Sequence, residues 1–365
     1  MKLKDVCLNI TDGTHSTVLD SPGGDNYLLS CKNVKFGNIL ISNNDRRIDD
    51  STLLALRART KMAVNDVVLS SVGTIGEVAL IKRNPNYEFQ RSVAILKPDA
   101  AKVLPKYLLY FLMSNNGQSI IKEHIKGAAQ PCLFLNDIRD IEIPIQDVAV
   151  QQHIVNTIGT VDDLIEKKEN EFRAKTKLLC LLFDKFESKE IMSFGEAFKA
   201  FNGGTFQSKF YVPYSKNKLI TIKNVDDNGF NTESVSYISD YKADKKFLLK
   251  QGDIVLTMTG NIGRIGIVDE NNCYLNQRVL RLECQSKSYL FAYLLKYKNE
   301  IIQLGKGTAQ LNLSLEDLKQ LVVHNSDTEI KQFSKYDCLF DSLLQCKLII
   351  KKAKDLKATL LNKYF

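Results

Sequence analysis

A long proline-free segment, residues 151–186, constrains the fold of this chain more than any other feature. Its apolar side chains recur with gaps that alternate between four and three residues, once Lys168 and Lys175 are allowed as interruptions. This is the heptad pattern of a helix that packs along another helix. Such a helix spans on the order of 50 Å, so it needs an equally long partner. The seam residues are Ile154, Ile158, Val161, Ile165, Phe172, Leu179 and Phe186.

The C-terminal segment, residues 329–365, is predicted to be that partner. It is also proline-free and helix-favouring, and its apolar positions superpose on those of the first segment, with Phe365 falling on Phe186. Two unrelated amphipathic surface helices are the alternative on this pattern alone. The seam of the second helix is predicted to include Phe333, Phe340, Leu344 and Leu361.

The totals for the chain indicate an ordinary globular protein. A length of 365 residues allows two or three domains, each with its own core. The net charge of +8 is compatible with a polyanionic partner without demonstrating one. Eight cysteines form no C-x-x-C pair, which indicates a reducing compartment and no structural zinc. We find no signal peptide and no apolar run of membrane-spanning length, so we expect a cytoplasmic protein without a membrane partner.

The two halves of the chain repeat one another. Five short segments of the first half recur in the same order in the second half, and the spacing between copies drifts slowly in one direction. Changes of loop length between two copies of one module produce such a drift, so we predict the order module, helix, module, helix. The pairs are Gly13-Thr14 with Gly204-Thr205, Lys32-Asn33-Val34 with Lys223-Asn224-Val225, 66–76 with 253–263, Gln90-Arg91 with Gln277-Arg278, and 126–130 with 306–310.

The modules mix strand and helix signals. In the first module, strands are predicted at 27–34, 67–72, 77–82 and 91–97, and helices at 105–114 and 136–140. We expect an α/β (α+β) fold in which two pseudo-symmetric domains are joined by two long helices that form an antiparallel coiled coil. The expected boundaries are 1–148 for the first domain, 149–188 for the central helix, 189–326 for the second domain and 327–365 for the closing helix.

A protein with this symmetry suits double-stranded DNA, whose half-sites one helical turn apart lie roughly 34–36 Å from each other. Reading bases requires Arg, Lys, Asn or Gln side chains on loops. The densest basic, amide-rich runs of the two modules align poorly with each other, as readers of different half-sites would, whereas a solvated charged surface is the alternative for each residue. The candidates are Asn43, Asn44, Arg46, Arg47, Arg57, Arg59, Lys61, Lys209, Lys216, Lys218, Lys223, Lys242, Lys245 and Lys246.

Other motifs are interpreted as scaffold. Gln90-Arg91, its counterpart pair and the repeated Lys-Gly-x-Ala-Gln occur in both copies, so we interpret them as structural. The string 84–87, Asn-Pro-Asn-Tyr, lacks the second proline of an adenine methyltransferase loop and is predicted to be a hairpin turn. The Gly73-x-x-Gly76 segment and its copy are predicted to be tight turns between strands. We therefore predict no catalytic residue, no metal and no cofactor.

The order of these pieces resembles the specificity (S) subunits of type I restriction–modification systems, over essentially the whole chain. The second long helix departs from the family pattern, since Glu329-Ile330-Lys331 replaces the Gln-Gln start of the first. The resemblance is carried by the segments 65–76 and 252–263, the two Gln-Arg pairs, the segments 127–138 and 307–318, and the helix opening at 151–166.

This resemblance implies two target-recognition domains that each read one half of a split DNA sequence. The paired helices would act as a ruler and as the docking surface for two methyltransferase (M) subunits, and restriction (R) subunits would join the full complex. The S subunit itself would be non-catalytic. One alternative is a specificity subunit of a type IIB-like fused restriction–methylation enzyme, which the neighbouring genes would reveal. The other is a coiled-coil adaptor that binds proteins and is indifferent to DNA.

Overall fold

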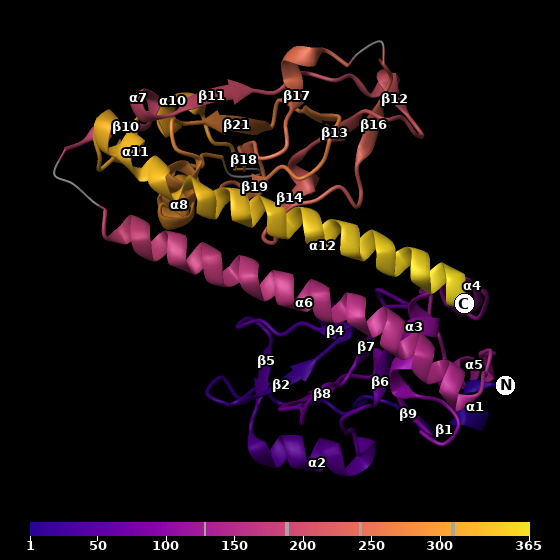
Figure 1. Cartoon of the computed structure of the whole chain (residues 1–365). Helices are drawn as coiled ribbons and strands as arrows, with labels where there is room; N and C mark the ends of the chain where they lie inside the picture. The colour runs from indigo at the N-terminus through magenta and orange to yellow at the C-terminus, as the bar shows by residue number, and fades with distance from the viewer. Residues whose placement is uncertain (128, 187–189, 241–242, 308–310) are drawn as a thin grey trace. The chain divides into compact units, whose positions relative to one another are not determined.

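The computed structural model describes residues 1–127, 129–186, 190–240, 243–307 and 311–365, which form two compact units (Figure 1). Unit 1 comprises Met1–Leu164 and Ala353–Phe365, and unit 2 comprises Ile165–Lys352. Two long helices, α6 (Val148–Asp184) and α12 (Asp337–Tyr364), contribute residues to both units. Each unit combines mainly antiparallel sheets with separate helices, which confirms the predicted α+β class.

Unit 1 contains two sheets that share a core. The larger sheet has the order β1-β9-β6-β7 and is antiparallel, whereas the smaller has the order β5-β2-β8 with β2 and β8 parallel. Strands β3 and β4 form a separate hairpin. The elements are α1 Leu3–Val6, β1 Cys7–Asp12, β2 Asn26–Leu29, η1 Cys31–Asn33, β3 Val34–Lys35, β4 Asn38–Ile39, β5 Arg46–Ile48, α2 Asp50–Thr60, β6 Val67–Ser70, β7 Val78–Leu80, β8 Tyr87–Phe89, β9 Val93–Pro98, α3 Pro105–Met113, α4 Asn115–Glu123 and α5 Leu135–Asp140.

The larger sheet of unit 1 is covered on both faces. Val67 and Leu69 of β6 point into the core formed with α3, while Val68 between them points into the core shared with the smaller sheet. Strand side chains alternate between faces, so a sheet buried on both sides needs an unbroken apolar run. This is why the strands near 67–72 and 91–97 could be predicted.

Two local predictions for unit 1 are wrong. The strand predicted at 27–34 ends at Leu29, because Ser30 starts a 3-10 helix in which its backbone N–H donates to Asn33 Oδ1 at 3.0 Å. Residues 84–87 are not a hairpin turn, since 84–86 belong to the connection between β7 of the larger sheet and β8 of the smaller sheet, and Tyr87 begins β8. Helix α2 was not predicted, and it lies at the edge of the unit away from α6 (Figure 1).

Unit 2 repeats most of this element order. Its larger sheet has the order β11-β21-β18-β19, and its smaller sheet has the order β12-β16-β13-β20-β17. The elements are β10 Met192–Ser193, α7 Phe194–Ala197, β11 Lys199–Asn202, η2 Ser208–Phe210, β12 Tyr211–Val212, β13 Lys218–Ile220, η3 Ile222–Asn224, β14 Val225–Asp226, β15 Gly229–Phe230, β16 Ser236–Ile238, η5 Lys245–Phe247, β17 Leu248–Leu249, β18 Ile254–Thr257, β19 Ile265–Ile267, β20 Cys273–Leu275, β21 Val279–Glu283, α8 Lys287–Lys296, α9 Lys298–Gln303, α10 Leu315–Lys319, β22 Val322–Val323, α11 Asp327–Phe333 and η6 Ser334–Tyr336.

The two long helices run antiparallel, because opposite ends share a core in each unit. In unit 1, Ile154 and Ile158 near the start of α6 share a core with Leu361 near the end of α12. In unit 2, Leu179 at the end of α6 shares a core with Phe340 at the start of α12. The predicted antiparallel pairing is therefore confirmed. No helix among the described residues combines the length and the apolar character needed to cross a bilayer.

Most of the predicted seam positions are buried. The polar interruptions form an ion cluster instead, in which Glu171 accepts from Lys168 at 2.7 Å and from Lys175. The hydrogen bond from Lys168, followed by that from Lys175, lowers the pKa of Glu171 to about 2. The buried seam residues are Ile154, Ile158, Val161, Leu179, Phe333, Phe340 and Leu361, and the partly buried ones are Ile165, Phe172, Phe186 and Leu344.

The superposition of the two helices needs correction. The closing segment is not one continuous helix, since the 3-10 turn Ser334–Tyr336 separates α11 from α12. The Phe365 ring packs on Tyr107 of α3, with ring centroids 5.0 Å apart. In unit 2 the ring that packs on Tyr289 of α8 belongs to Phe183, also at 5.0 Å, and Phe186 packs on another ring.

We expect replacement of Leu361 by Ala to destabilise unit 1 by about 2–5 kcal/mol, because a buried side chain leaves a cavity in its core. The control is Leu356→Ala on the same helix, where the side chain is 49% exposed and the expected change is within about 0.5 kcal/mol. Hydrogen exchange of peptides covering 105–113, read by mass spectrometry, measures the effect. Unchanged protection in the Leu361 variant would contradict this packing.

Candidate nucleic-acid interface

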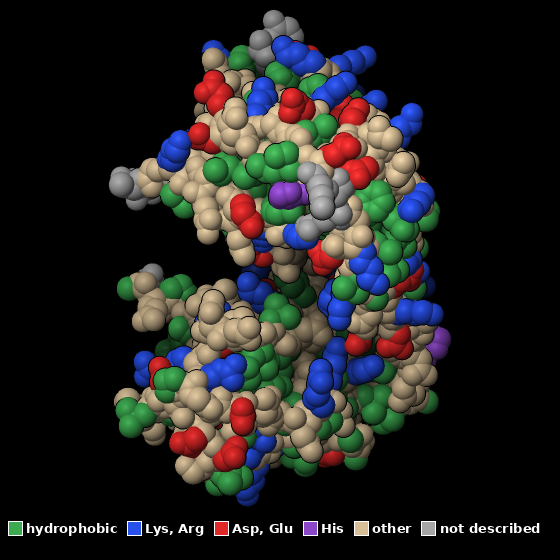
Figure 2. All heavy atoms as spheres, turned by 90° about the vertical axis from the view of Figure 1, so that its left-hand side faces the viewer, with side chains coloured by type: hydrophobic (Ala, Val, Ile, Leu, Met, Phe, Trp, Pro, Cys, Tyr) green, Lys and Arg blue, Asp and Glu red, His purple; other side chains and the backbone are tan. Residues whose placement is uncertain are grey.

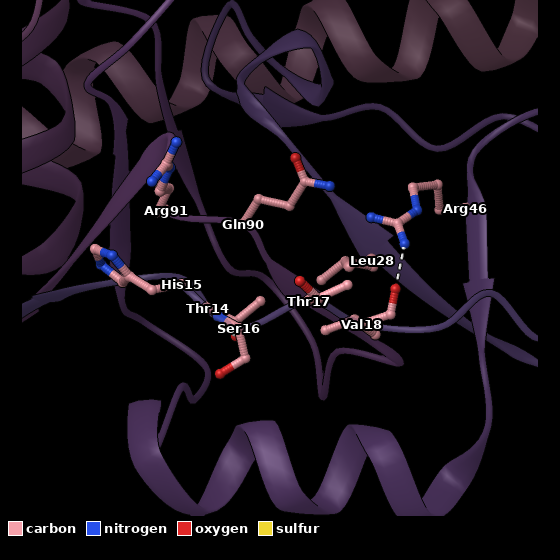
Figure 3. A pocket seen from close by; sticks show the side chains of 9 residues that line it. All are labelled: Thr14, His15, Ser16, Thr17, Val18, Leu28, Arg46, Gln90 and Arg91. Carbon is pink, nitrogen blue, oxygen red and sulfur yellow. Dashed lines mark hydrogen bonds between the residues drawn. The ribbon is translucent and has the colours of Figure 1, made fainter.

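Unit 1 has an open hollow of about 210 Å³ beside its smaller sheet (Figure 3). Four separate segments line it, namely residues 14–18, Leu28 of β2, Arg46 at the start of β5, and Gln90-Arg91 just after β8. In Figure 3, Gln90 and Arg46 extend toward one another, whereas Arg91 lies at the other end beside His15. The hollow therefore combines two guanidiniums with an amide.

The backbone under the hollow is firmly held. Thr14 N–H donates to Phe89 O at 2.8 Å, and Arg91 N–H donates to Thr14 O at 3.0 Å. A side chain at Gly13 would bring its Cβ to 2.1 Å from Phe89 O, so this close approach requires glycine. These contacts fix the backbone from which Gln90 and Arg91 project.

Arg46 is part of the wall of the hollow. Its Nε donates to Asp20 Oδ1 at 2.6 Å, and its Nη2 donates to Val18 O at 2.7 Å. Arg46 thus ties the segment 14–20 to β5. By contrast, the Arg91 side chain is exposed, and among the described residues we find no hydrogen-bond acceptor for its guanidinium and no partner for the Gln90 amide.

The loop that carries Asn43 and Asn44 is anchored by Asp45. The buried Asp45 carboxylate accepts from Asn33 Nδ2 at 2.9 Å and pairs with Lys32 at 2.9 Å. Burial raises the pKa of Asp45, but hydrogen bonds, of which that from Lys32 is the largest, outweigh it and lower the pKa. The two exposed amides consequently lie on a loop with a fixed base.

The arginines of α2 bind other groups of unit 1. Arg57 Nε donates to the buried Glu88, and Arg57 Nη2 donates to Tyr87 O at 2.8 Å. Arg59 Nη2 donates to Asp12 O at 2.6 Å. Both guanidiniums are thus engaged within unit 1, where they join α2 to β8 and β1.

Arg47 and Lys61 complete the candidates of unit 1. Arg47 Nη1 donates to Gly24 O at 3.0 Å, and its guanidinium lies 4.8 Å from the centre of the Tyr27 ring. Lys61 ends α2 in the left-handed conformation with φ 49°, and it is exposed. Arg47 is therefore partly committed to the fold, whereas Lys61 faces solvent.

Most of the described unit 2 candidates have a nearby partner. Exposed ion pairs contribute little stability, so a phosphate could replace such partners. Lys223 and Lys245 are exposed, and we find no partner for their ammonium groups in the part of the chain that is described. Lys242 lies outside the described residues. The contacts are Lys216 with Asp240 at 3.7 Å, Lys218 with Glu270 at 3.7 Å, Lys246 with Asp244 at 3.1 Å, and Lys209 over the Phe210 ring at 5.1 Å.

The predicted equivalence of the two Gln-Arg pairs is wrong by one residue. Arg91 N–H donates to Thr14 O in unit 1, and in unit 2 the corresponding bond runs from Gln277 N–H to Gly204 O at 3.0 Å. The connection before β8, residues 81–86, is one residue longer than its counterpart 268–272, which shifts everything after it. Gln277 therefore stands where Arg91 does, and Gly204 where Thr14 does. The argument that these side chains are shared scaffold no longer holds.

Unit 2 differs from unit 1 around the equivalent of the hollow. Ser236 pairs with β13 at the register position that Arg46 holds on β2. Gln277 Oε1 accepts from Thr205 Oγ1 at 2.6 Å, and the neighbouring Phe206 packs on Phe247 with ring centroids 5.9 Å apart. The same backbone frame thus carries arginines in unit 1 and uncharged side chains in unit 2.

The lysine of the repeated Lys-Gly segment forms a structural ion pair in both units. Lys126 pairs with Asp137 in unit 1, and Lys306 pairs with Asp317 at 2.9 Å in unit 2. In both cases the lysine precedes a short helix and binds the acidic residue in its first turn. Residues 128 and 308–310 of the motif lie outside the described residues.

Sequence reasoning missed the segment 15–18 of the hollow. His15 Nε2 lies 2.6 Å from Asp12 Oδ2, and the segment follows directly on Gly13-Thr14. Gly13 was the available signal, since it marks where the backbone approaches β8. Its counterpart in unit 2 is Gly203, so the predicted pairing of Gly13-Thr14 with Gly204-Thr205 is also wrong by one residue. On the face shown in Figure 2, Lys and Arg side chains are interspersed with Asp and Glu side chains. No group of three or more potential metal ligands occurs among the described residues.

Comparisons with known proteins agree on one family. A family model described as type I restriction modification DNA specificity domain matches residues 2–172 and 185–332. The type I restriction enzyme MjaIX specificity subunit of Methanocaldococcus jannaschii is 25% identical over 393 residues, covering 97% of this chain and 90% of that protein. The EcoBI specificity subunit of Escherichia coli is 27% identical over 124 residues, 33% of this chain and 26% of that protein. The crystal structure of a type I restriction-modification system S subunit from M. genitalium shares the fold, with a TM-score of 0.59 at 17% identity, covering 100% of this chain and 95% of that one.

Replacement of Arg57 by Ala is expected to destabilise unit 1 by about 3–5 kcal/mol, because it leaves the Glu88 carboxylate buried without its cation. The matched control is Arg83→Ala, which removes an exposed guanidinium from the same unit and should change stability by less than about 0.5 kcal/mol. Thermal unfolding followed by circular dichroism compares the two. Equal midpoints would show that the Arg57 side chain is not structural.

Proposed function

Because the chain belongs to the type I restriction–modification DNA specificity family, we propose that it is the DNA specificity subunit of a type I complex and reads a two-part DNA sequence. The observation that carries this proposal is that the two units share the same backbone hydrogen bonds around the hollow but place different side chains on that backbone. Equivalent backbone hydrogen bonds support the hollow region in both, yet Arg46 and Arg91 correspond to Ser236 and Gln277. Two readers of different sequences need a common scaffold with different contact residues.

The proposed DNA surface of unit 1 comprises the anchored loop with Asn43 and Asn44 and the exposed Lys61. Arg46 and Arg47 border this surface, where their bonds to Asp20, Val18 O and Gly24 O tie β5 to the segment 18–24. We leave out Arg57 and Arg59, because their guanidiniums already bind Glu88 and backbone carbonyls. In unit 2 the proposed contacts to phosphate come from the exposed lysines. They are Lys209, Lys216, Lys223, Lys245 and Lys246, with Lys218 and Lys242 as further candidates.

The proposed protein partners are methyltransferase and restriction subunits, with two methyltransferase copies for the two recognition units. Most of the seam side chains are buried in the cores of the two units, so docking would use the outer faces of the helices. Leu178 and Leu181 of α6 support this, since they are 46% and 50% exposed and adjoin the buried Leu179. Methyl transfer and cleavage would be carried out by the partners, and this chain would select the DNA.

For the complete complex, the logarithm of the DNA affinity should fall linearly with the logarithm of the salt concentration, with a slope of about 0.9 for each phosphate neutralised. Replacing Lys61, Lys223 and Lys245 together by Ala should reduce that slope by up to about 2.7, because three phosphate contacts are lost. Fluorescence anisotropy across a salt series measures it.

The control for the triple variant is Lys122→Ala on α4, whose side chain is exposed but lies outside the proposed surface. Its slope should equal that of the unaltered complex. If the triple variant also kept the original slope, the phosphate contacts would have been assigned to the wrong residues.

A further inference from the structure

We propose that the hollow of unit 1 reads a guanine through Arg91, which makes Arg91 a specificity-determining residue. This proposal rests on the proposed function and adds the class of base and the side chain that contacts it. It reverses the interpretation of Gln90-Arg91 as scaffold, whose basis was a match between copies that is one residue out of register.

The availability of Arg91 is the first argument. Its guanidinium is exposed at the rim of the hollow, and the described residues provide no acceptor for its N–H donors. Arg46 in the same hollow is different, since two of its donors already bind Asp20 and Val18 O. Arg46 therefore acts as a positioning residue for the wall, and Arg91 is the donor left for a ligand.

The chemistry of the lining is the second argument. The commonest sequence-specific contact to DNA is an arginine that donates two hydrogen bonds to O6 and N7 of guanine in the major groove. Gln90, the neighbour of Arg91 in the sequence, places an amide that both donates and accepts at the Arg46 end of the hollow, as reading a base edge requires. Phosphate oxygens only accept hydrogen bonds, so a phosphate would use the donors of Arg91 and Gln90 and leave the acceptor of the amide unused, whereas a base edge can use both.

The rigidity of the frame is the third argument. Discrimination between bases needs a side chain held in a fixed register, and the backbone at Arg91 is tied to Thr14, which is tied in turn to Phe89. The same frame in unit 2 presents Gln277 instead of Arg91. The substitution Arg91→Gln therefore gives unit 1 the side chain that unit 2 carries, on a backbone that accepts it.

The test uses the full chain assembled with its methyltransferase subunits. Transfer of labelled methyl groups is measured on a panel of duplexes that carry the natural two-part sequence and every single base-pair change within it. With Arg91→Gln, discrimination at one G·C pair of one half-site should fall by about 5- to 150-fold. Discrimination at all other positions should stay as in the unaltered complex. Arg83→Gln, an exposed arginine of the same unit outside the hollow, should change no position.

Three results would overturn the assignment while leaving the proposed function intact. Unchanged discrimination at every position would show that Arg91 contacts no base. An even loss of transfer on all duplexes would show a phosphate contact only. Altered discrimination in both half-sites would show that Arg91 acts on the complex as a whole. If the unaltered complex methylated all duplexes equally, the proposed function itself would fail, and this inference with it.

Discussion

The mutual burial of the apolar faces of α6 and α12 is the interaction on which the rest of the structure depends. In unit 1, Leu361 joins the core built around the start of α6. In unit 2, Leu179 of α6 joins the core that contains Phe333 and Phe340. Unit 2 is one contiguous stretch, Ile165–Lys352, whereas unit 1 joins Met1–Leu164 to Ala353–Phe365, so unit 1 cannot finish folding until residues 353–365 are available. The helices are therefore structural parts of both units.

The two units share the hydrogen bonds that hold their smaller sheets in place, but they differ in an exposed loop. Asn26 Nδ2 donates to Asp50 in unit 1 and Asn217 Nδ2 donates to Asp240 in unit 2, each tying the smaller sheet to the segment that follows it. The loop anchored by Asp45 has no such copy. Asn224, the counterpart of Asn33, leaves its side-chain Nδ2 buried without a hydrogen-bond partner among the described residues. This difference between the units thus lies in a loop that is proposed to meet DNA.

The features that could be predicted from the sequence are those whose signal is local or repeated. Helix α6 is predicted by the heptad spacing of its apolar residues, and β6 by the unbroken apolar run of a strand that is buried on both faces. The order of the repeated segments predicts the two units. The candidate site was harder to predict because it depends on contacts between distant residues. Arg57 was a candidate for DNA until Glu88 proved to lie beside it.

The hollow itself could not be predicted, since four separate segments form it. The match of Gln90-Arg91 to Gln277-Arg278 failed for a related reason. The Gln-Arg dipeptide occurs in both copies, but the loop before it is one residue shorter in the second copy, so the two dipeptides are not structurally equivalent. The hydrogen bonds of Thr14 and Gly204 show the true register.

The central claim is that this chain selects the DNA sequences on which a type I complex acts. The most direct test is a genome-wide map of methylated adenines in cells with and without the gene. We predict that one two-part motif, with two specified halves separated by an unspecified gap, is methylated only when the chain is present. A map that is the same in both strains would contradict the account.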